Sequence, residues 1–354
     1  MTTIRFYRIY DAGMAIDLDG LEAAFAEKYV TSRARFRRIR PKSIVMDTPP
    51  LVLSIGQIPV EAGGKTYEMS VSAKILDIGV ISICIFCDLG ESSPADLLDT
   101  AILFGEQEDL SVHFNNTLET LDEIFSMNVS DFVMEQDFFE DYTIYTVGRE
   151  ADAPDPVALL LCDRTDFSDQ FREDTLRNTL SYSRDEKVII SWDGALIISP
   201  DSPDDILDLI EYANVQVFEL RYYDRELTNR IEKMYDDIED ADRMSWFRRM
   251  YRYHGIMVAT MEIYADLHEI IERVNNLIKV TEDVYYARVY ETALREFRIG
   301  QWSGSVTRKI DVLRENYSML SDEVRIQHSY FLEWIIILLI AFEFGFAMWQ
   351  YMVQ

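Results

Sequence analysis

The sequence predicts an α+β N-terminal domain followed by an all-α bundle of long helices and a single C-terminal transmembrane helix. Three observations predict it. Apolar runs alternate with helical patterns through residues 1–200, all nine prolines lie at or before Pro203, and a continuous apolar stretch occupies the end of the chain. We expect an acidic α+β head at residues 1–200, a helical bundle or stalk at 201–328 and a membrane anchor at 329–354.

The head is expected to combine strands and helices. Apolar runs predict strands at Ile4–Tyr10, Ser43–Ile55, Tyr67–Ile75, Gly79–Cys87, Tyr142–Val147, Lys187–Ile190 and Ala195–Ser199. Helical patterns cover Leu18–Tyr29, Pro94–Phe104 and Leu110–Met127. Gly63 and Gly64 indicate a hairpin turn, and Ser93 is placed as the N-cap of a helix that begins at Pro94.

The segment after Pro203 is expected to be helical, because it has no proline and only four glycines. Predicted helices cover Asp204–Ala213 running into Val217–Ile238, then Asp242–Val280 and Thr281–Ile299, with a turn at Gly300–Gly304. Apolar residues at helical spacing favour a bundle core. From Val306 the apolar positions follow the 4-3 spacing of a coiled coil, which continues into the apolar tail.

The tail, Ile335–Val353, is long and apolar enough to span a bilayer. Its residues, at about 1.5 Å each, cover roughly 28 Å, close to the thickness of the hydrocarbon layer. Trp334 and Trp349 flank it as an aromatic belt would, and Glu343 is its one ionisable residue. A membrane anchor is the favoured interpretation, and a buried helix inside a soluble oligomer is the alternative.

Flanking charges predict that the bulk of the chain is on the cytoplasmic side, and the lack of a transit peptide favours a bacterial inner (cytoplasmic) membrane. Arg308, Lys309, Arg314 and Arg325 precede the span, and Lys and Arg favour the cytoplasmic side. Only Gln354 follows it, as in a tail anchor. The N-terminus shows no secretory signal or transit peptide, and three cysteines fit a reducing compartment.

Glu343 lies near the middle of the predicted span, where a charged carboxylate costs about 2.5–3.5 kcal/mol. We expect it at a helix–helix contact of a homo-oligomer, packed through Gly345 and Ala341. A Glu343 that faces lipid and one that lines a pore are the alternatives. The candidate anchor and oligomer-contact residues are therefore Trp334, Glu343, Gly345 and Trp349.

A basic cluster runs against the formal net charge of −29. Its members are Arg33, Arg35, Arg37, Arg38, Arg40 and Lys42. It could contact an anion or a partner, including nucleic acid or a ribosome, or it could pair with the protein's own carboxylates. The acidic chain as a whole repels nucleic acid. A second basic group, Arg248, Arg249 and Arg252, lies among aromatic residues and leaves the same alternatives open.

No motif in the sequence indicates catalysis. The glycine patterns of phosphate loops, dinucleotide folds and nucleophile elbows do not occur. Cys84 and Cys87 would face opposite sides of a strand, and His268 with Glu272 forms one isolated pair of possible metal ligands. We expect no enzyme activity, no cofactor and no metal. An enzyme without a visible motif would need a deep polar pocket in the head.

The tail also carries a family resemblance. Leu332-Glu333-Trp334, the apolar run that follows and Glu343 resemble the C-terminal end of the required-for-meiotic-nuclear-division family, and Ala287–Gln327 is similar too. The resemblance implies a single C-terminal anchor, an α+β head and self-association. It also implies a role like that of relatives which affect sporulation or support mitochondrial translation. That family has no established catalytic residues.

These patterns predict a non-enzymatic, tail-anchored, oligomeric scaffold that recruits an unknown cytoplasmic protein to the membrane. The alternative is an ion-conducting or ion-regulated membrane oligomer. The order of an acidic α/β domain, long helices and a membrane segment is similar to that of CorA-type magnesium channels. This chain departs from them, because it has one predicted span and no Gly-Met-Asn tripeptide.

Overall fold

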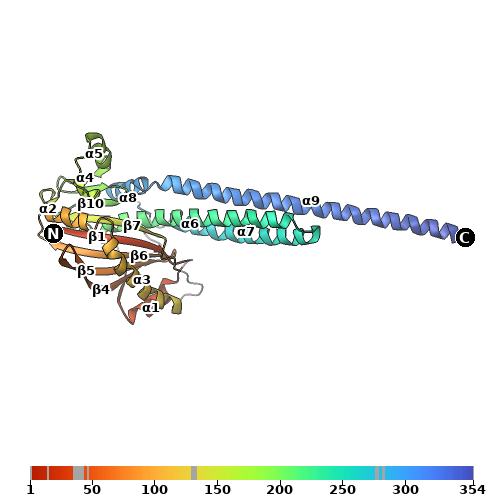
Figure 1. The fold of residues 1–354 in the computed structure, drawn as a ribbon, viewed down its shortest axis with the longest axis horizontal. Helices are drawn as coiled ribbons and strands as arrows, with labels where there is room; N and C mark the ends of the chain where they lie inside the picture. The colour runs from red at the N-terminus through yellow and green to blue at the C-terminus, as the bar shows by residue number, and fades with distance from the viewer. Residues whose placement is uncertain are drawn as a thin grey trace. The chain divides into compact units, whose positions relative to one another are not determined.

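The computed structural model describes residues 2–13, 16–34, 44–45, 48–128, 134–275, 279–280 and 284–353. The chain divides into two compact units. Unit 1 comprises Met1–Tyr222 and Glu272–Trp302, and unit 2 comprises Tyr223–Ile271 and Ser303–Gln354. The predicted fold class is confirmed: a sheet domain precedes long helices, the last of which is long and apolar (Figure 1). The expected boundaries at residues 200 and 328 stay a prediction.

Unit 1 is built on a nine-stranded sheet with the order β2-β4-β5-β6-β1-β7-β10-β9-β8. Its strands are β1 (Thr2–Asp11), β2 (Val30–Arg33), β4 (Leu51–Ala62), β5 (Lys65–Leu76), β6 (Val80–Gly90), β7 (Phe139–Val147), β8 (Thr179–Leu180), β9 (Lys187–Ile190) and β10 (Gly194–Ile198). Neighbouring strands are antiparallel except for β7 and β10, which are parallel. Strands β3 (Ile44–Val45) and β11 (Lys279–Val280) form a separate ladder.

Helices cover both faces of the central strands. The helices of unit 1 are α1 (Leu18–Ala26), α2 (Pro94–Leu103), α3 (Glu108–Asn128), α4 (Pro156–Leu160), α5 (Asp169–Leu176), α8 (Val284–Glu296) and the first part of α6 (Asp204–Asp242), with the short 3-10 turn η1 (Glu150–Asp152). One sheet face meets α1 and α3 through a core that includes Phe6, Ile83 and Phe125. The opposite face meets the start of α6, where Lys74 contacts Asp208.

Local signals placed several elements correctly. Gly63 and Gly64 have φ values of 56° and 75°, which an L side chain would rarely adopt, and they join β4 to β5. Ser93 caps α2: its hydroxyl accepts from the backbone N–H of Asp96, whose carboxylate accepts in return from the N–H of Ser93. The predicted hairpin turn and helix start are both confirmed.

Two predicted elements have different bounds. The strand expected at Ser43–Ile55 is interrupted, and β4 begins at Leu51, after two prolines that lack the N–H a ladder requires. The turn expected at Gly300–Gly304 is wrong, because both glycines lie inside α9 (Ile299–Val353). The break lies at Arg298 instead, where φ is 56° and α8 has just ended.

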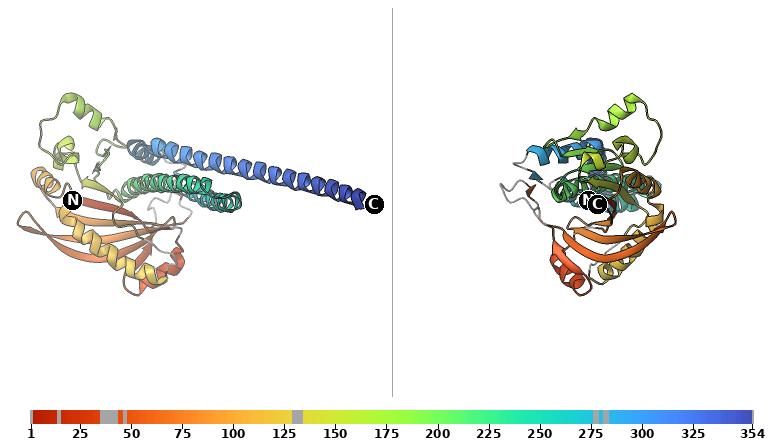
Figure 2. Two further views of the ribbon diagram at one scale, coloured as in Figure 1. Left: turned by 45° about the vertical axis from the view of Figure 1, so that its right-hand side comes forward. Right: turned by 90° about the vertical axis from the view of Figure 1, so that its left-hand side faces the viewer.

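Unit 2 consists of the second half of α6, most of α7 (Trp246–Asn275) and most of α9. The second half of α6 runs beside α7 (Figures 1 and 2). The buried apolar residues of unit 2 include Leu227 and Met234 on α6, Ile256 on α7, and Leu313 and Leu320 on α9. The first part of the 4-3 pattern is therefore buried within the chain's own helices. Whether the pattern also forms a coiled coil with a second copy stays a prediction.

Candidate membrane anchor

The end of α9 exposes apolar side chains on every side of the helix. Exposure exceeds a third for each of six consecutive residues: Ile335 37%, Ile336 55%, Ile337 54%, Leu338 63%, Leu339 63% and Ile340 59%. Because successive helical residues are about 100° apart, six of them pass completely around the axis. A surface helix of a soluble protein has one apolar stripe, whereas this helix is apolar all round. It needs a surrounding apolar medium or a partner that encloses it.

By length and composition, α9 is the one helix in the described part of the chain that qualifies as a candidate membrane span. Its most apolar 18-residue window has a mean hydropathy of 1.4, and none of that window is buried. A core helix of a soluble protein passes the same test of composition, but it is mostly buried. The exposure of α9 therefore supports the predicted association with a membrane.

The four predicted anchor residues all lie on α9. Trp334 and Trp349 are 64% and 61% exposed, and their fifteen-residue separation places them about 22 Å apart along the axis. Glu343 is exposed between them. A Cβ added at Gly345 would meet no atom within 4 Å, so this small residue leaves open space for lipid or for a second helix. The structure is compatible with a membrane anchor and with a contact between copies of the chain.

The first residue of α7 contacts α9 immediately before the apolar stretch. The indole N–H of Trp246 donates to Oε1 of Gln327 at 2.9 Å. The ring of Trp246 stacks on Phe331, with centroids 5.2 Å apart and an interplanar angle of 28°. At the other end of unit 2, Lys309 bonds Asp224 at 2.8 Å. These contacts hold α9 along α6 and α7 from Lys309 to Phe331.

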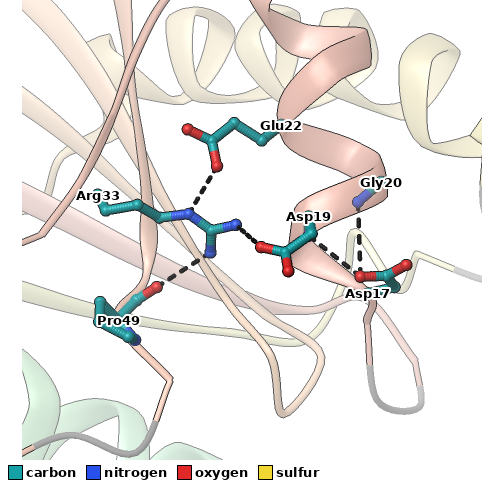
Figure 3. Close-up of polar contacts among 6 residues, drawn as sticks. All are labelled: Asp17, Asp19, Gly20, Glu22, Arg33 and Pro49. Carbon is teal, nitrogen blue, oxygen red and sulfur yellow. Dashed lines mark hydrogen bonds and ion pairs between the residues drawn. The ribbon is translucent and has the colours of Figure 1, made fainter.

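The described part of the predicted basic cluster is engaged within the head. Arg33 binds Asp19 at 2.6 Å and Glu22 at 2.7 Å, and it donates to the carbonyl of Pro49 at 3.2 Å (Figure 3). The guanidinium thus joins the end of β2 to α1, whose N-cap is Asp17 (Figure 3). Arg35, Arg37, Arg38, Arg40 and Lys42 lie outside the described residues. Their contact with an anion or partner stays a prediction.

The cysteines of β6 lie on opposite faces of the sheet, as predicted for positions i and i+3. Cys87 is in the core beneath α1 and α3, whereas Cys84 lines a cavity of about 220 Å³ on the face that meets α6. Burial raises the pKa of the Cys84 thiol to about 12 and that of Cys87 to about 11. Both thiols therefore stay protonated at neutral pH, unlike nucleophilic or metal-binding cysteines.

A buried ion cluster joins the sheet to α6 beside Cys84. Lys74 on β5 binds Asp208 at 2.6 Å and Glu211 at 2.7 Å, and the side chain of Glu211 is 3% exposed. Desolvation alone would lower the pKa of Lys74, but the two carboxylates raise it well above its usual value. Lys74 is therefore a charged structural partner rather than an activated amine.

The head contains a polar cavity of about 490 Å³, within the size range of small-molecule sites. It lies among the end of α2, the start of α3, β7, α4 and the turn between β9 and β10. The carboxylates that line it are Glu106, Glu108, Asp109, Asp141 and Asp193. Its walls also include Gln107, Thr143, Tyr145 and Cys162. The sequence did not point to this cavity, because its residues come from distant segments.

Both acidic and neutral side chains line the cavity. Asp141 and Asp193 are exposed, whereas Gln107 is 3% exposed and donates through its amide to Thr143 at 3.1 Å. The Oε1 atom of Gln107 has no hydrogen-bond partner. Partial desolvation and the nearby Asp141 raise the pKa of Asp193. The site combines an unused buried acceptor with negative potential, which favours a cation that donates hydrogen bonds.

Metal ligands do not converge in the described part of the chain: it contains no group of three or more His, Cys, Asp or Glu side chains that could hold an ion. The side chain of His268 lies outside the described residues, and its suggested partner Glu272 is exposed on α7.

The N-terminal part of the chain, which includes the sheet of unit 1, matches a known family. Residues 1–205 match the family described as "Uncharacterized protein MJ0711, N-terminal domain". The chain belongs to this family. The "Uncharacterized protein MJ0711" of Methanocaldococcus jannaschii is 24% identical over 226 residues, which cover 60% of this chain and 66% of that relative, slightly under two thirds of its length. No solved structure matches the chain.

This membership corrects the resemblance to the required-for-meiotic-nuclear-division family, which is wrong. The match lies in the N-terminal 205 residues, and not at the C-terminus, where the resemblance was placed. The resemblance depended on the pattern around Leu332–Trp334 and Glu343. An apolar spanning helix draws on few residue types, so such helices resemble one another without common descent. The expected link to sporulation or mitochondrial translation falls with it.

Proposed function

We propose that this protein is a non-enzymatic membrane scaffold. In this proposal the end of α9 lies in the cytoplasmic membrane, the head lies on the cytoplasmic side, and the head recruits a cytoplasmic protein. The observation that carries the proposal is the exposure of apolar side chains all round α9 from Ile335 to Ile340. Such a surface is unfavourable in water by roughly 25 cal/mol for each Å² of apolar area. Insertion into a bilayer removes that cost.

The arrangement of unit 2 supports a stalk. Contacts of Lys309 with Asp224 and of Trp246 with Gln327 hold α9 against α6 and α7 up to the start of the apolar stretch. Beyond Phe331, residues 332–345 of the helix are exposed. In the proposal the supported part sets the distance between the head and the membrane, and the unsupported part is the anchor. Self-association would pack copies through Gly345, with Glu343 at the contact.

The test compares the full chain with a version that ends at Arg325. Membranes from cells that make each version are washed with alkaline carbonate, which removes peripheral proteins. We expect the full chain to stay in the membrane pellet and the shortened chain to be soluble. A full chain that washes off would contradict the anchor. Crosslinking in intact membranes then tests the oligomer, and recovery of monomers alone would contradict it.

The acidic cavity favours a second candidate function, the binding of a small organic cation by the head. The supporting observation is the unpartnered Oε1 of Gln107, which lines the cavity together with the carboxylates of Asp141 and Asp193. A molecule with several ammonium groups would donate to Gln107 and pair with these carboxylates. The channel alternative, in which Glu343 lines a pore, stays a prediction.

Calorimetric titration with spermidine tests this second candidate on the full chain in neutral detergent. Asp141→Asn/Asp193→Asn should weaken binding several-fold. The control Glu119→Gln/Glu123→Gln removes the same charge from exposed positions of α3 and should change it little. Equal loss in both variants would mean that only the overall negative charge attracts the ligand. Displacement of spermidine by equimolar Mg²⁺ would contradict an organic-cation site.

A further inference from the structure

The turn after α6 and the start of α7 carry exposed apolar side chains, where the surface of a soluble protein would be polar. We define the hairpin tip as residues 243–251, which cover the turn after α6 and the first residues of α7. Its exposed apolar side chains are Met244 at 41%, Phe247 at 71% and Tyr251 at 84%. These residues lie in unit 2, whose α9 carries the candidate anchor.

We propose that the hairpin tip lies in the headgroup layer of the bilayer that holds α9. The tip then gives the protein a second contact with the membrane, at the interface between lipid and water. This inference rests on the proposed anchor. The tip binds the lipid surface itself and not a protein partner. A single helix fixes the depth of a protein but leaves it free to tilt, and a second contact restrains the tilt.

The depth of the tip follows from its contacts with α9. Trp246 and Phe247 contact Phe331, with ring centroids 5.2 Å and 6.3 Å apart. Phe331 precedes Ile335 by four residues, which is about 6 Å along a helix. The headgroup region extends about 5–8 Å beyond the hydrocarbon on each side of a bilayer. If Ile335 begins the hydrocarbon span, the tip is at headgroup depth.

The chemistry of the tip fits that layer. Trp and Tyr gather at membrane interfaces because a ring can lie among the lipids while its polar atom reaches water or headgroups. Phe247 adds an apolar ring, and the exposed Arg248 can bind a lipid phosphate with its planar fork. Trp334, 64% exposed on α9, extends the same aromatic zone. The basic and aromatic group noted in the sequence thereby gains a role.

Charges near the tip bear on the kind of lipid. Arg243 pairs with Glu239 and Asp240, and Arg252 pairs with Asp237, so these carboxylates offset part of the basic charge. A surface with both positive and negative side chains does not need anionic lipid in order to bind a bilayer. We therefore expect the aromatic side chains to hold the tip, and a zwitterionic bilayer to be sufficient.

The experiment measures the depth of a fluorescent label at Met244→Cys in the full chain, held in phosphatidylcholine nanodiscs. Lipids with brominated chains quench labels that lie near them. A matched label at Glu232→Cys is twelve residues earlier on α6, about 18 Å from the tip, at another exposed position. A third label at Leu339→Cys reports on the anchor. Wild type treated with the same label corrects for any reaction at the native cysteines Cys84, Cys87 and Cys162.

We expect bromolipid quenching at Met244→Cys and Leu339→Cys and none at Glu232→Cys. Phe247→Ser/Tyr251→Ser should reduce quenching at the tip and leave it unchanged at Leu339→Cys. Quenching at Leu339→Cys but not at the tip would overturn this inference and leave the anchor intact. A tip shielded from water but not quenched would mean that protein covers it, which also overturns the inference. The absence of quenching at Leu339→Cys would reject the anchor itself.

Discussion

Glu219 lies in an environment that disfavours an ionised carboxylate. It lies on α6 with no exposed surface, and neither carboxylate oxygen has a hydrogen-bond partner. Desolvation by burial, and then the nearby Asp11, raise its pKa well above the usual value. Folding therefore keeps Glu219 protonated at a pH where the unfolded chain would release the proton.

This raised pKa gives stability a definite pH dependence. Above the unfolded pKa of about 4.3, the unfolded state ionises while the folded state stays protonated, so stability falls by up to about 1.4 kcal/mol per pH unit. The loss continues until the pH reaches the folded pKa. Glu219→Gln removes the titration, so we expect a higher melting temperature than wild type at pH 8 and no gain at pH 4. Thermal melts followed by circular dichroism would contradict this if both proteins showed the same pH dependence.

Lys74 provides a second prediction, because its two carboxylate partners would be left without a cation. Glu211 is almost fully buried beside it, and removal of one partner of a buried ion pair costs about 3–5 kcal/mol. We expect Lys74→Met to lower the free energy of unfolding by about this amount in urea titrations. Lys74→Met/Glu211→Gln should recover part of the loss. A double variant no more stable than the single one would mean that the pair is not what Lys74 contributes.

Among the elements, those with a local cause could be predicted from sequence. The helix that begins at Pro94, the hairpin at Gly63-Gly64 and the strands β5, β6 and β9 follow from caps, glycines and apolar runs. The break at Arg298 was missed because a non-glycine residue there adopts φ of 56°, which its residue type does not signal. The cavity was missed because Gln107, Asp141 and Asp193 approach one another only through the pairing of β7 with its neighbours.

The cap of α2 allows a test at the scale of one element. Ser93→Ala removes the acceptor for the N–H of Asp96, and loss of an N-cap costs about 0.5–2 kcal/mol. We expect a lower urea concentration at the midpoint of unfolding. The slope of the unfolding free energy against urea concentration should be unchanged, because unfolding exposes the same surface area. Ser93→Thr keeps the hydroxyl and should stay close to wild type. A loss as large in Ser93→Thr would show that the change acts through packing and not through the cap.

At the scale of the whole molecule, the acidic charge and the apolar residues of the chain lie in different segments. A formal charge of −29 keeps most of the chain in water, while the residues after Phe331 form a helix without a polar face. The sequence predicted this division, because the length and apolar character of a span are properties of one continuous segment. It could not predict the contacts of Trp246 with Gln327 and Phe331, which join residues far apart in the chain.

The most direct test of the membrane anchor is a depth profile along α9. Spin labels are placed one at a time on cysteines from Ile326 to Met348 in lipid nanodiscs, and their collisions with oxygen and with a water-soluble nickel chelate are compared. The account predicts oxygen contact that rises beyond Trp334 and is greatest near Phe344, on all sides of the helix. Contact with nickel throughout, or protection on one stripe that repeats every 3.5 residues, would place α9 in a soluble helical assembly and contradict the anchor.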